Sequence, residues 1–95
     1  MDNGFLPIGT IVKLVDVEKK VMISGYCSIE FENEALLYDY EGVGYPEGTL
    51  LKNNTISFNK ADIIEIIHEG YRDDDFNLLN ETLNKDNSEI ETLED

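Results

Sequence analysis

The fold is decided by one stretch, Leu36-Leu37-Tyr38-Asp39-Tyr40-Glu41-Gly42-Val43-Gly44-Tyr45-Pro46-Glu47-Gly48. It holds three of the five tyrosines and one of the two prolines of the chain. The two-residue period of a strand places Leu36, Tyr38 and Tyr40 on one face. The glycines favour a bulge, and Tyr-Pro-Glu-Gly at 45–48 matches a type I turn. The stretch therefore predicts a central strand at residues 35–43 that ends in a turn.

Four further segments predict strands around this one. Residues 10–15 alternate and are rich in β-branched side chains, and residues 55–58 form a short strand-like run after turn residues. Residues 63–69 contain four isoleucines within five positions and are followed by Gly70. This density of isoleucine predicts a strand that is buried on both sides.

The remaining strand is predicted at residues 21–29. Its two-residue period puts Cys27 on the same apolar face as Ile23 and puts Tyr26 on the opposite face. Gly25 in the middle predicts a bulge, which lets a short sheet curl. Because Cys27 falls on the apolar face, we expect a buried, inert thiol.

The last quarter of the chain has a helical pattern. The acids at 73–75 predict an N-cap and first helical turn, because carboxylates accept the unpaired N–H groups there. One apolar face at helical spacing is formed by Phe76, Leu79 and Leu83. Residues 86–95 are polar and acidic, and we expect them to be disordered.

Together these segments predict a mainly β fold. The expected architecture is a small antiparallel five-stranded barrel or roll, SH3-like in size, with a short C-terminal helix and one helical turn at 59–62. Three parts are expected along the chain: a small β domain at 1–71, an amphipathic helix at 72–85 and an acidic tail at 86–95.

Charge restricts the classes of partner. The chain carries 21 acids against 7 bases, a formal net charge of −14 over 95 residues. Such a chain repels nucleic-acid phosphates and anionic membrane surfaces, and it favours a solvated surface or a basic partner protein. Cys27 is the only cysteine, and neither a secretory signal nor a membrane-spanning run is apparent. We therefore expect a cytoplasmic protein without an internal disulfide.

The sequence offers no catalytic constellation. His68 is the only histidine, which excludes a histidine metal cluster. The run from Asp73 to Asn77 begins like a calcium loop, but the required glycine and final glutamate are missing. Asp39 and Glu41 share a strand face at a spacing that a glycosidase could use, although so small a domain has little room for a sugar. We expect no enzyme, no metal and no cofactor.

Protein binding is the remaining hypothesis, and two groups of residues are candidates for it. Tyrosine has a large apolar ring and a polar tip, so it suits both a core edge and an interface. Both readings stay open for Tyr38, Tyr40 and Tyr45. The helix face of Phe76, Leu79 and Leu83 could likewise pack on its own barrel or on a partner.

Several short motifs resemble those of one family. They are Leu-Pro-Ile-Gly-Thr-Ile-Val at 6–12, Met-Ile-x-Gly-Tyr at 22–26, Tyr-Asp-Tyr-x-Gly at 38–42, Tyr-Pro-Glu-Gly at 45–48 and Glu-Gly-Tyr at 69–71. Over residues 6–76 the chain resembles an uncharacterised family of small acidic proteins of Gram-positive bacteria. The members of that family are often encoded in type VII secretion loci, beside WXG100-like proteins and LXG-type toxins.

The resemblance implies a setting and no catalytic residue. It implies a non-enzymatic accessory, chaperone or targeting factor that binds a toxin or a WXG100-like secretion protein. The alternative is an acidic immunity protein or nucleic-acid mimic that blocks a basic toxin surface.

Overall fold

The computed structural model describes the backbone of residues 4–31 and 35–93, and the side chains of residues 4–27 and 36–84. The elements are, in chain order, β1 (Ile11–Leu14), β2 (Val17–Phe31), β3 (Ala35–Gly44), the 3-10 helix η1 (Gly48–Leu50), β4 (Thr55–Phe58), the 3-10 helix η2 (Lys60–Asp62), β5 (Ile63–His68) and α1 (Asp74–Leu93). The prediction of a mainly β fold with one C-terminal helix is confirmed.

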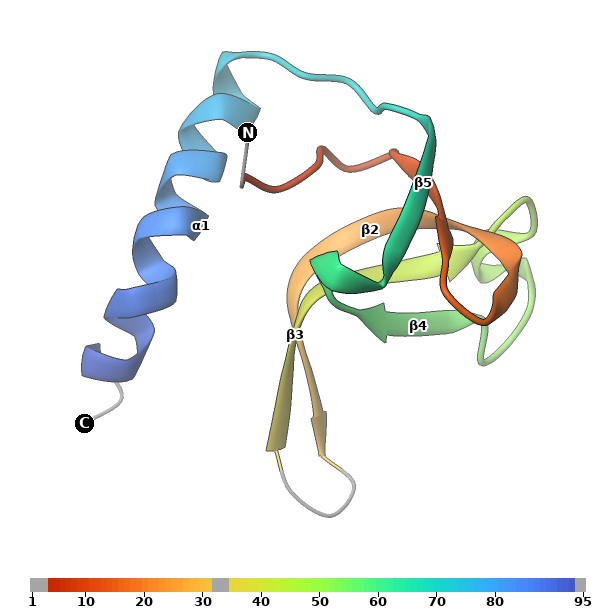
Figure 1. Cartoon of the computed structure of the whole chain (residues 1–95), viewed down its shortest axis with the longest axis horizontal. Helices are drawn as coiled ribbons and strands as arrows, with labels where there is room; N and C mark the ends of the chain where they lie inside the picture. The colour runs from red at the N-terminus through yellow and green to blue at the C-terminus, as the bar shows by residue number, and fades with distance from the viewer. Residues whose placement is uncertain (1–3, 32–34, 94–95) are drawn as a thin grey trace.

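The five strands form one antiparallel sheet in the order β4-β3-β2-β1-β5. The start of β2 pairs with β1, and most of β2 pairs with β3. Beyond the body of the sheet, the distal ends of β2 and β3 project as a hairpin (Figure 1). Within the described residues β4 and β5 are the two edges, so the sheet curls strongly but does not close into a barrel.

The bulge predicted at Gly25 is confirmed, and it reverses the faces of β2. Ile23 pairs with Gly42 and Gly25 pairs with Glu41, so Ser24 is an extra residue in the ladder. One extra residue moves every later side chain to the other face of the sheet. Tyr26 consequently packs among core rings, so the prediction that put it opposite Ile23 is wrong.

The core is organised around an aromatic cluster of Phe5, Tyr26, Tyr40 and Phe58. The ring centroid of Tyr40 lies 5.4 Å from that of Phe5 and 5.3 Å from that of Phe58, and Tyr40 is only 1% exposed. Phe5 and Tyr26 meet edge to face at 5.6 Å, a geometry that aromatic quadrupoles favour. The aliphatic core around the cluster comes from Val12, Leu14, Val21 and Ile23.

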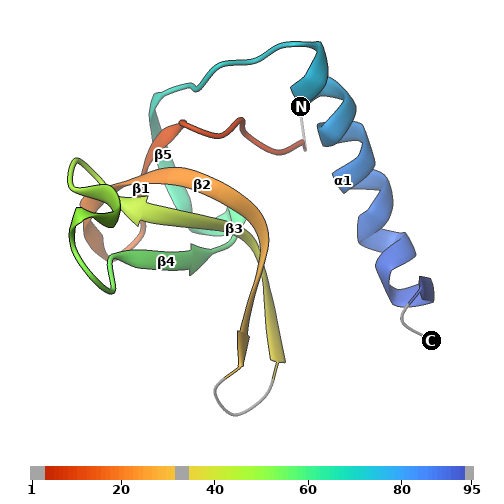
Figure 2. The ribbon, with the colours of Figure 1, turned by 180° about the vertical axis from the view of Figure 1, so that it is seen from behind.

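Hydrogen bonds from the same tyrosines fix the N-terminal segment, residues 4–8. The Leu6 N–H donates to the Tyr40 hydroxyl at 2.9 Å, and the Tyr26 hydroxyl donates to the Leu6 carbonyl at 2.6 Å. The Phe5 N–H donates to the side-chain oxygen of Asn80 in α1 at 2.8 Å. The N-terminal segment therefore lies between the sheet and α1, as views from two opposite sides show (Figures 1 and 2).

A second close contact joins this segment to the chain that leaves β5. The Gly70 N–H donates to the hydroxyl oxygen of Thr10 at 3.0 Å, and Thr10 is fully buried. A Cβ atom at Gly70 would collide with the Ile8 carbonyl oxygen and would lie 2.9 Å from the Thr10 nitrogen. Only glycine allows the two backbones to approach so closely.

The strand predicted at 63–69 is confirmed as β5, but the prediction that it is buried on both sides is wrong. In the part of the chain that the structure describes, β5 is an edge strand that pairs with β1 alone, and the pairing is irregular at two places. Ile64 is 63% exposed and Ile66 is 51% exposed. The density of isoleucine reports strand preference, whereas burial depends on which elements cover the strand.

The helical segments differ in length from their predictions. The turn predicted at 59–62 is confirmed as η2, and Asn59 and Asp62 form a capping box there. The helix predicted at 72–85 is α1, which continues to Leu93 through most of the segment predicted to be disordered. The disorder prediction rested on polarity, which reports the lack of a core and does not measure local helix propensity.

Substitution of Tyr40 tests the role of the aromatic cluster. We expect Tyr40→Ala to lower the free energy of unfolding by about 3–5 kcal/mol, because it leaves a large cavity. Tyr40→Phe keeps the ring but removes the hydroxyl that accepts the Leu6 N–H, and it should cost about 1–3 kcal/mol. Urea denaturation of both variants measures the difference. Unfolding midpoints equal to the wild type would contradict a core role for Tyr40.

Gly70→Ala tests the contact between the N-terminal segment and the end of β5. We expect a loss of about 1–3 kcal/mol in the free energy of unfolding, because backbone atoms must move apart. Gly25→Ala is the matched control, since its nearest neighbour would lie 3.8 Å from the new Cβ atom. The control should change stability by less than about 0.5 kcal/mol. Equal losses in the two variants would argue against the contact.

Candidate protein-binding groove

An apolar groove lies where the N-terminal segment meets the start of α1, and we call it the α1 groove. Its volume is about 300 Å³, at the lower end of ligand pockets in proteins. Four separate parts of the chain contribute to it: the N-terminal segment, β2, the link between β5 and α1, and α1 itself. Its lining residues are Pro7, Ile8, Tyr26, Tyr71, Asp75, Phe76 and Leu79.

The cap of α1 positions the helical side of the groove. The Phe76 N–H donates to the Asp73 carboxylate at 3.0 Å, and the Asn77 N–H donates to the Asp73 carbonyl at 2.9 Å. Asp73 is thus the N-cap, and the predicted role of this acidic run at the helix start is confirmed. The cap fixes the first turn, from which Phe76 lines the groove, and Leu79 follows about one turn later.

The groove combines a buried floor with exposed walls. Phe76 is 8% exposed, and Tyr26 is half-buried with its hydroxyl bonded to Leu6. Tyr71, in contrast, is 80% exposed, and Ile8 and Leu79 are also exposed. Apolar side chains that stay in water around a concave site are typical of a surface that a partner covers.

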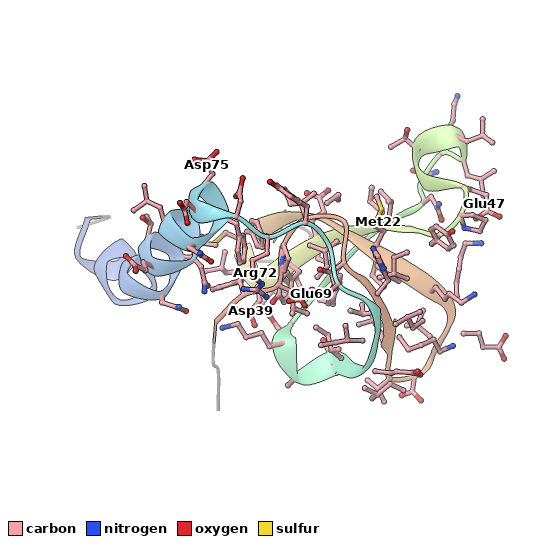
Figure 3. All side chains as sticks on the ribbon, turned by 90° about the horizontal axis from the view of Figure 1, so that it is seen from above. Met22, Asp39, Glu47, Glu69, Arg72 and Asp75 are labelled. Carbon is pink, nitrogen blue, oxygen red and sulfur yellow. The ribbon has the colours of Figure 1, made fainter. Side chains whose placement is uncertain are left out.

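Charge at the groove is dominated by carboxylates. Arg72 forms an ion pair with Glu69, and its guanidinium lies 5.0 Å from the centre of the Phe76 ring. Figure 3 shows these two charged side chains close together, with Asp75 on the first turn of α1. Burial raises the pKa of the Tyr26 phenol, and the Arg72 cation opposes that rise. The Tyr26 phenol is therefore neutral at physiological pH.

The structure separates the six residues predicted to bind a partner. Phe76 and Leu79 line the groove, whereas Leu83 packs against the core of its own domain. The sequence leaves two roles open for Tyr40, one in the core and one at an interface. Because Tyr40 is buried, it is a core residue in this fold and is not accessible to a partner. Tyr38 is half-buried on β3, and Tyr45 is exposed in the turn after β3. Neither residue lines the groove.

Sequence reasoning missed most of the groove. It did not identify Pro7, Ile8 or Tyr71 as candidate binding residues, because they come from segments far apart in the chain. The Glu-Gly-Tyr motif at 69–71 was a usable signal, because Gly70 permits a close backbone contact immediately before Tyr71. A regular two-residue period puts Tyr26 on the wrong face, because the extra residue at the bulge reverses the face of every later side chain in β2.

Two carboxylates on or near β3, those of Asp39 and Glu47, have structural partners. The Asp39 carboxylate accepts the Lys60 N–H at 2.9 Å and so supports η2. Glu47 forms an ion pair with Lys19 at 2.7 Å, and the hydrogen bond from Lys19 lowers the pKa of the Glu47 carboxyl. Within the described residues, no three His, Cys, Asp or Glu side chains are grouped so that they could hold a metal.

A second, smaller cavity lies near the β3–β4 connection. Its volume is about 130 Å³, and its lining includes Val17, Lys19, Asn54 and Ile56. The Asn54 side chain donates to the carbonyls of Gly44 and Gly48, so it holds the turn in place. We assign this cavity a structural role.

Among the described residues, no helix is both long and apolar enough to cross a membrane.

Comparison with known proteins identifies a family. No curated protein and no solved structure matches the chain. Residues 5–78, however, match a domain of unknown function, DUF4176. The match covers more than three quarters of the chain and includes every lining residue of the groove except Leu79. The expectation of an uncharacterised family is confirmed: the chain belongs to the DUF4176 family of domains of unknown function.

Proposed function

We propose that this protein is a non-enzymatic protein-binding factor that serves as an accessory, chaperone or targeting protein for toxins of a bacterial type VII secretion system. The observation that carries the proposal is the α1 groove. A concave apolar site with exposed walls offers favourable burial to a partner side chain. The resemblance of residues 6–76 to proteins of type VII secretion loci supplies the setting.

The composition of the groove favours binding over catalysis. Its ionisable residues are Tyr26, Tyr71 and Asp75. The Tyr26 hydroxyl is committed to the Leu6 carbonyl. General acid–base catalysis needs an acid and a base that are both held in position, whereas the groove offers the exposed carboxylate of Asp75 and the exposed phenol of Tyr71.

An immunity protein or nucleic-acid mimic is the second candidate function. The net charge of −14 supports it, because a strongly acidic protein can cover a basic toxin surface. Co-expression with a toxin from the same locus discriminates the two functions. An immunity protein protects the producing cell, whereas a targeting factor changes toxin export without protection.

Recovery of partners from the native host tests the proposed function. We expect the tagged full-length chain to recover a toxin or a WXG100-like protein of a secretion locus. Tyr71→Ala and Leu79→Asp should each reduce that recovery by about tenfold, in line with the 1–2 kcal/mol that interface anchors contribute. Quantitative mass spectrometry of the recovered proteins is the measurement.

Leu50→Asp is the matched control for this experiment. Leu50 is 83% exposed in η1 and does not line the groove, so its substitution should leave recovery unchanged. Circular dichroism verifies that each variant folds. Failure of the wild-type chain to recover any secretion-locus protein, or equal recovery by the groove variants, would contradict the proposal.

A further inference from the structure

We propose that the α1 groove binds a linear, positively charged amphipathic segment of the partner. An apolar anchor side chain of that segment occupies the groove, and a neighbouring Lys or Arg pairs with Asp75. The proposal rests on the proposed function for the use of the groove, and it adds the chemistry of the segment that the groove selects.

The size and lining of the groove define the anchor. A volume of about 300 Å³ accommodates only a small number of large side chains, so a folded surface does not enter it. The buried ring of Phe76 forms part of the floor, and the exposed side chains of Ile8 and Leu79 stand beside it. A leucine, methionine or phenylalanine in this position removes its own apolar area and that of the walls from water.

Charge complementarity defines the residues that flank the anchor. The described charged groups from 69 to 75 are four carboxylates and one guanidinium, and the guanidinium of Arg72 is paired with Glu69. Asp73 caps the helix, whereas Asp75 is exposed and lines the groove. The helix N-terminus contributes roughly half a positive charge, which the three successive aspartates exceed. The rim is therefore negative.

The charge of the whole chain acts in the same direction. A net charge of −14 attracts a cationic segment over distances near the Debye length, about 10 Å at 0.1 M salt, and accelerates its association. The same charge disfavours a second copy of this chain as the occupant. The chain has seven basic residues, and only Lys19 and Lys20 are adjacent.

Selection from a random peptide library displayed on phage tests the proposal with the purified full-length chain. We expect the selected peptides to carry a large apolar residue next to Lys or Arg. A selected peptide, synthesised with a fluorophore, should bind with a Kd on the order of micromolar by fluorescence anisotropy. Leu79→Asp should weaken this binding at least about tenfold.

The charge requirement has its own matched pair of variants. Asp75→Asn should weaken binding about three- to tenfold at about 0.05 M salt, and the effect should shrink at about 0.5 M salt because screening is stronger. Asp74→Asn removes the same charge from an exposed neighbour that does not line the groove, and it should change the Kd less than about twofold.

Three outcomes would overturn the proposal. They are selection of neutral or acidic peptides, equal effects of Asp74→Asn and Asp75→Asn, and a concentration-dependent dimer in sedimentation that Leu79→Asp abolishes. Because the peptides are tested on the purified chain, this result is independent of partner recovery from the host. Basic peptides that bind in the groove while no secretion-locus protein is recovered would overturn the proposed function and leave this inference standing.

Discussion

The structure depends on the way in which two tyrosine hydroxyls hold the backbone of Leu6. The Tyr40 hydroxyl accepts from the Leu6 N–H, and the Tyr26 hydroxyl donates to the Leu6 carbonyl. Both backbone polar groups of Leu6 are therefore paired without a neighbouring strand. An unpaired buried backbone group costs about 1–3 kcal/mol, so these bonds allow a non-strand segment to lie against the core. They also place Phe5 against the Tyr40 ring, where it completes the aromatic cluster.

The fixed N-terminal segment determines where α1 lies. The helix bonds to this segment through Asn80, and Phe76 lines the α1 groove together with Pro7 and Ile8 of the segment. Leu83 packs against the core. Because the segment lies between the first turns of α1 and the sheet, those turns do not lie flat on the strands (Figure 2). The α1 groove lies beside them. The groove thus follows from the same hydrogen bonds that complete the core.

A small domain has few ways to combine stability with recognition. This one packs the rings of the aromatic cluster in its core and leaves other apolar side chains, such as Tyr71 and Leu79, exposed. Chains of this size bury only roughly two-thirds of their unfolded surface, so the fold cannot cover every apolar residue. A strongly acidic surface opposes self-association through such exposed apolar side chains, because copies of the chain repel one another. An exposed apolar groove can therefore exist on this domain together with its strong acidic charge.

The sequence alone determined the strands, the bulge at Gly25, the turn at 59–62 and the N-cap of α1, because these depend on local periodicity, glycine and capping side chains. It could not determine the burial of β5, since four isoleucines predict a strand wherever that strand lies in the sheet. It identified Phe76 and Leu79 as a helix face but left their partner open. Only the tertiary structure decided that Tyr26 and Tyr40 are core residues and that Ile8, Tyr71 and α1 form one groove. The physical reason is that the groove is made by contacts between residues up to 72 positions apart, and local patterns contain no information about such contacts.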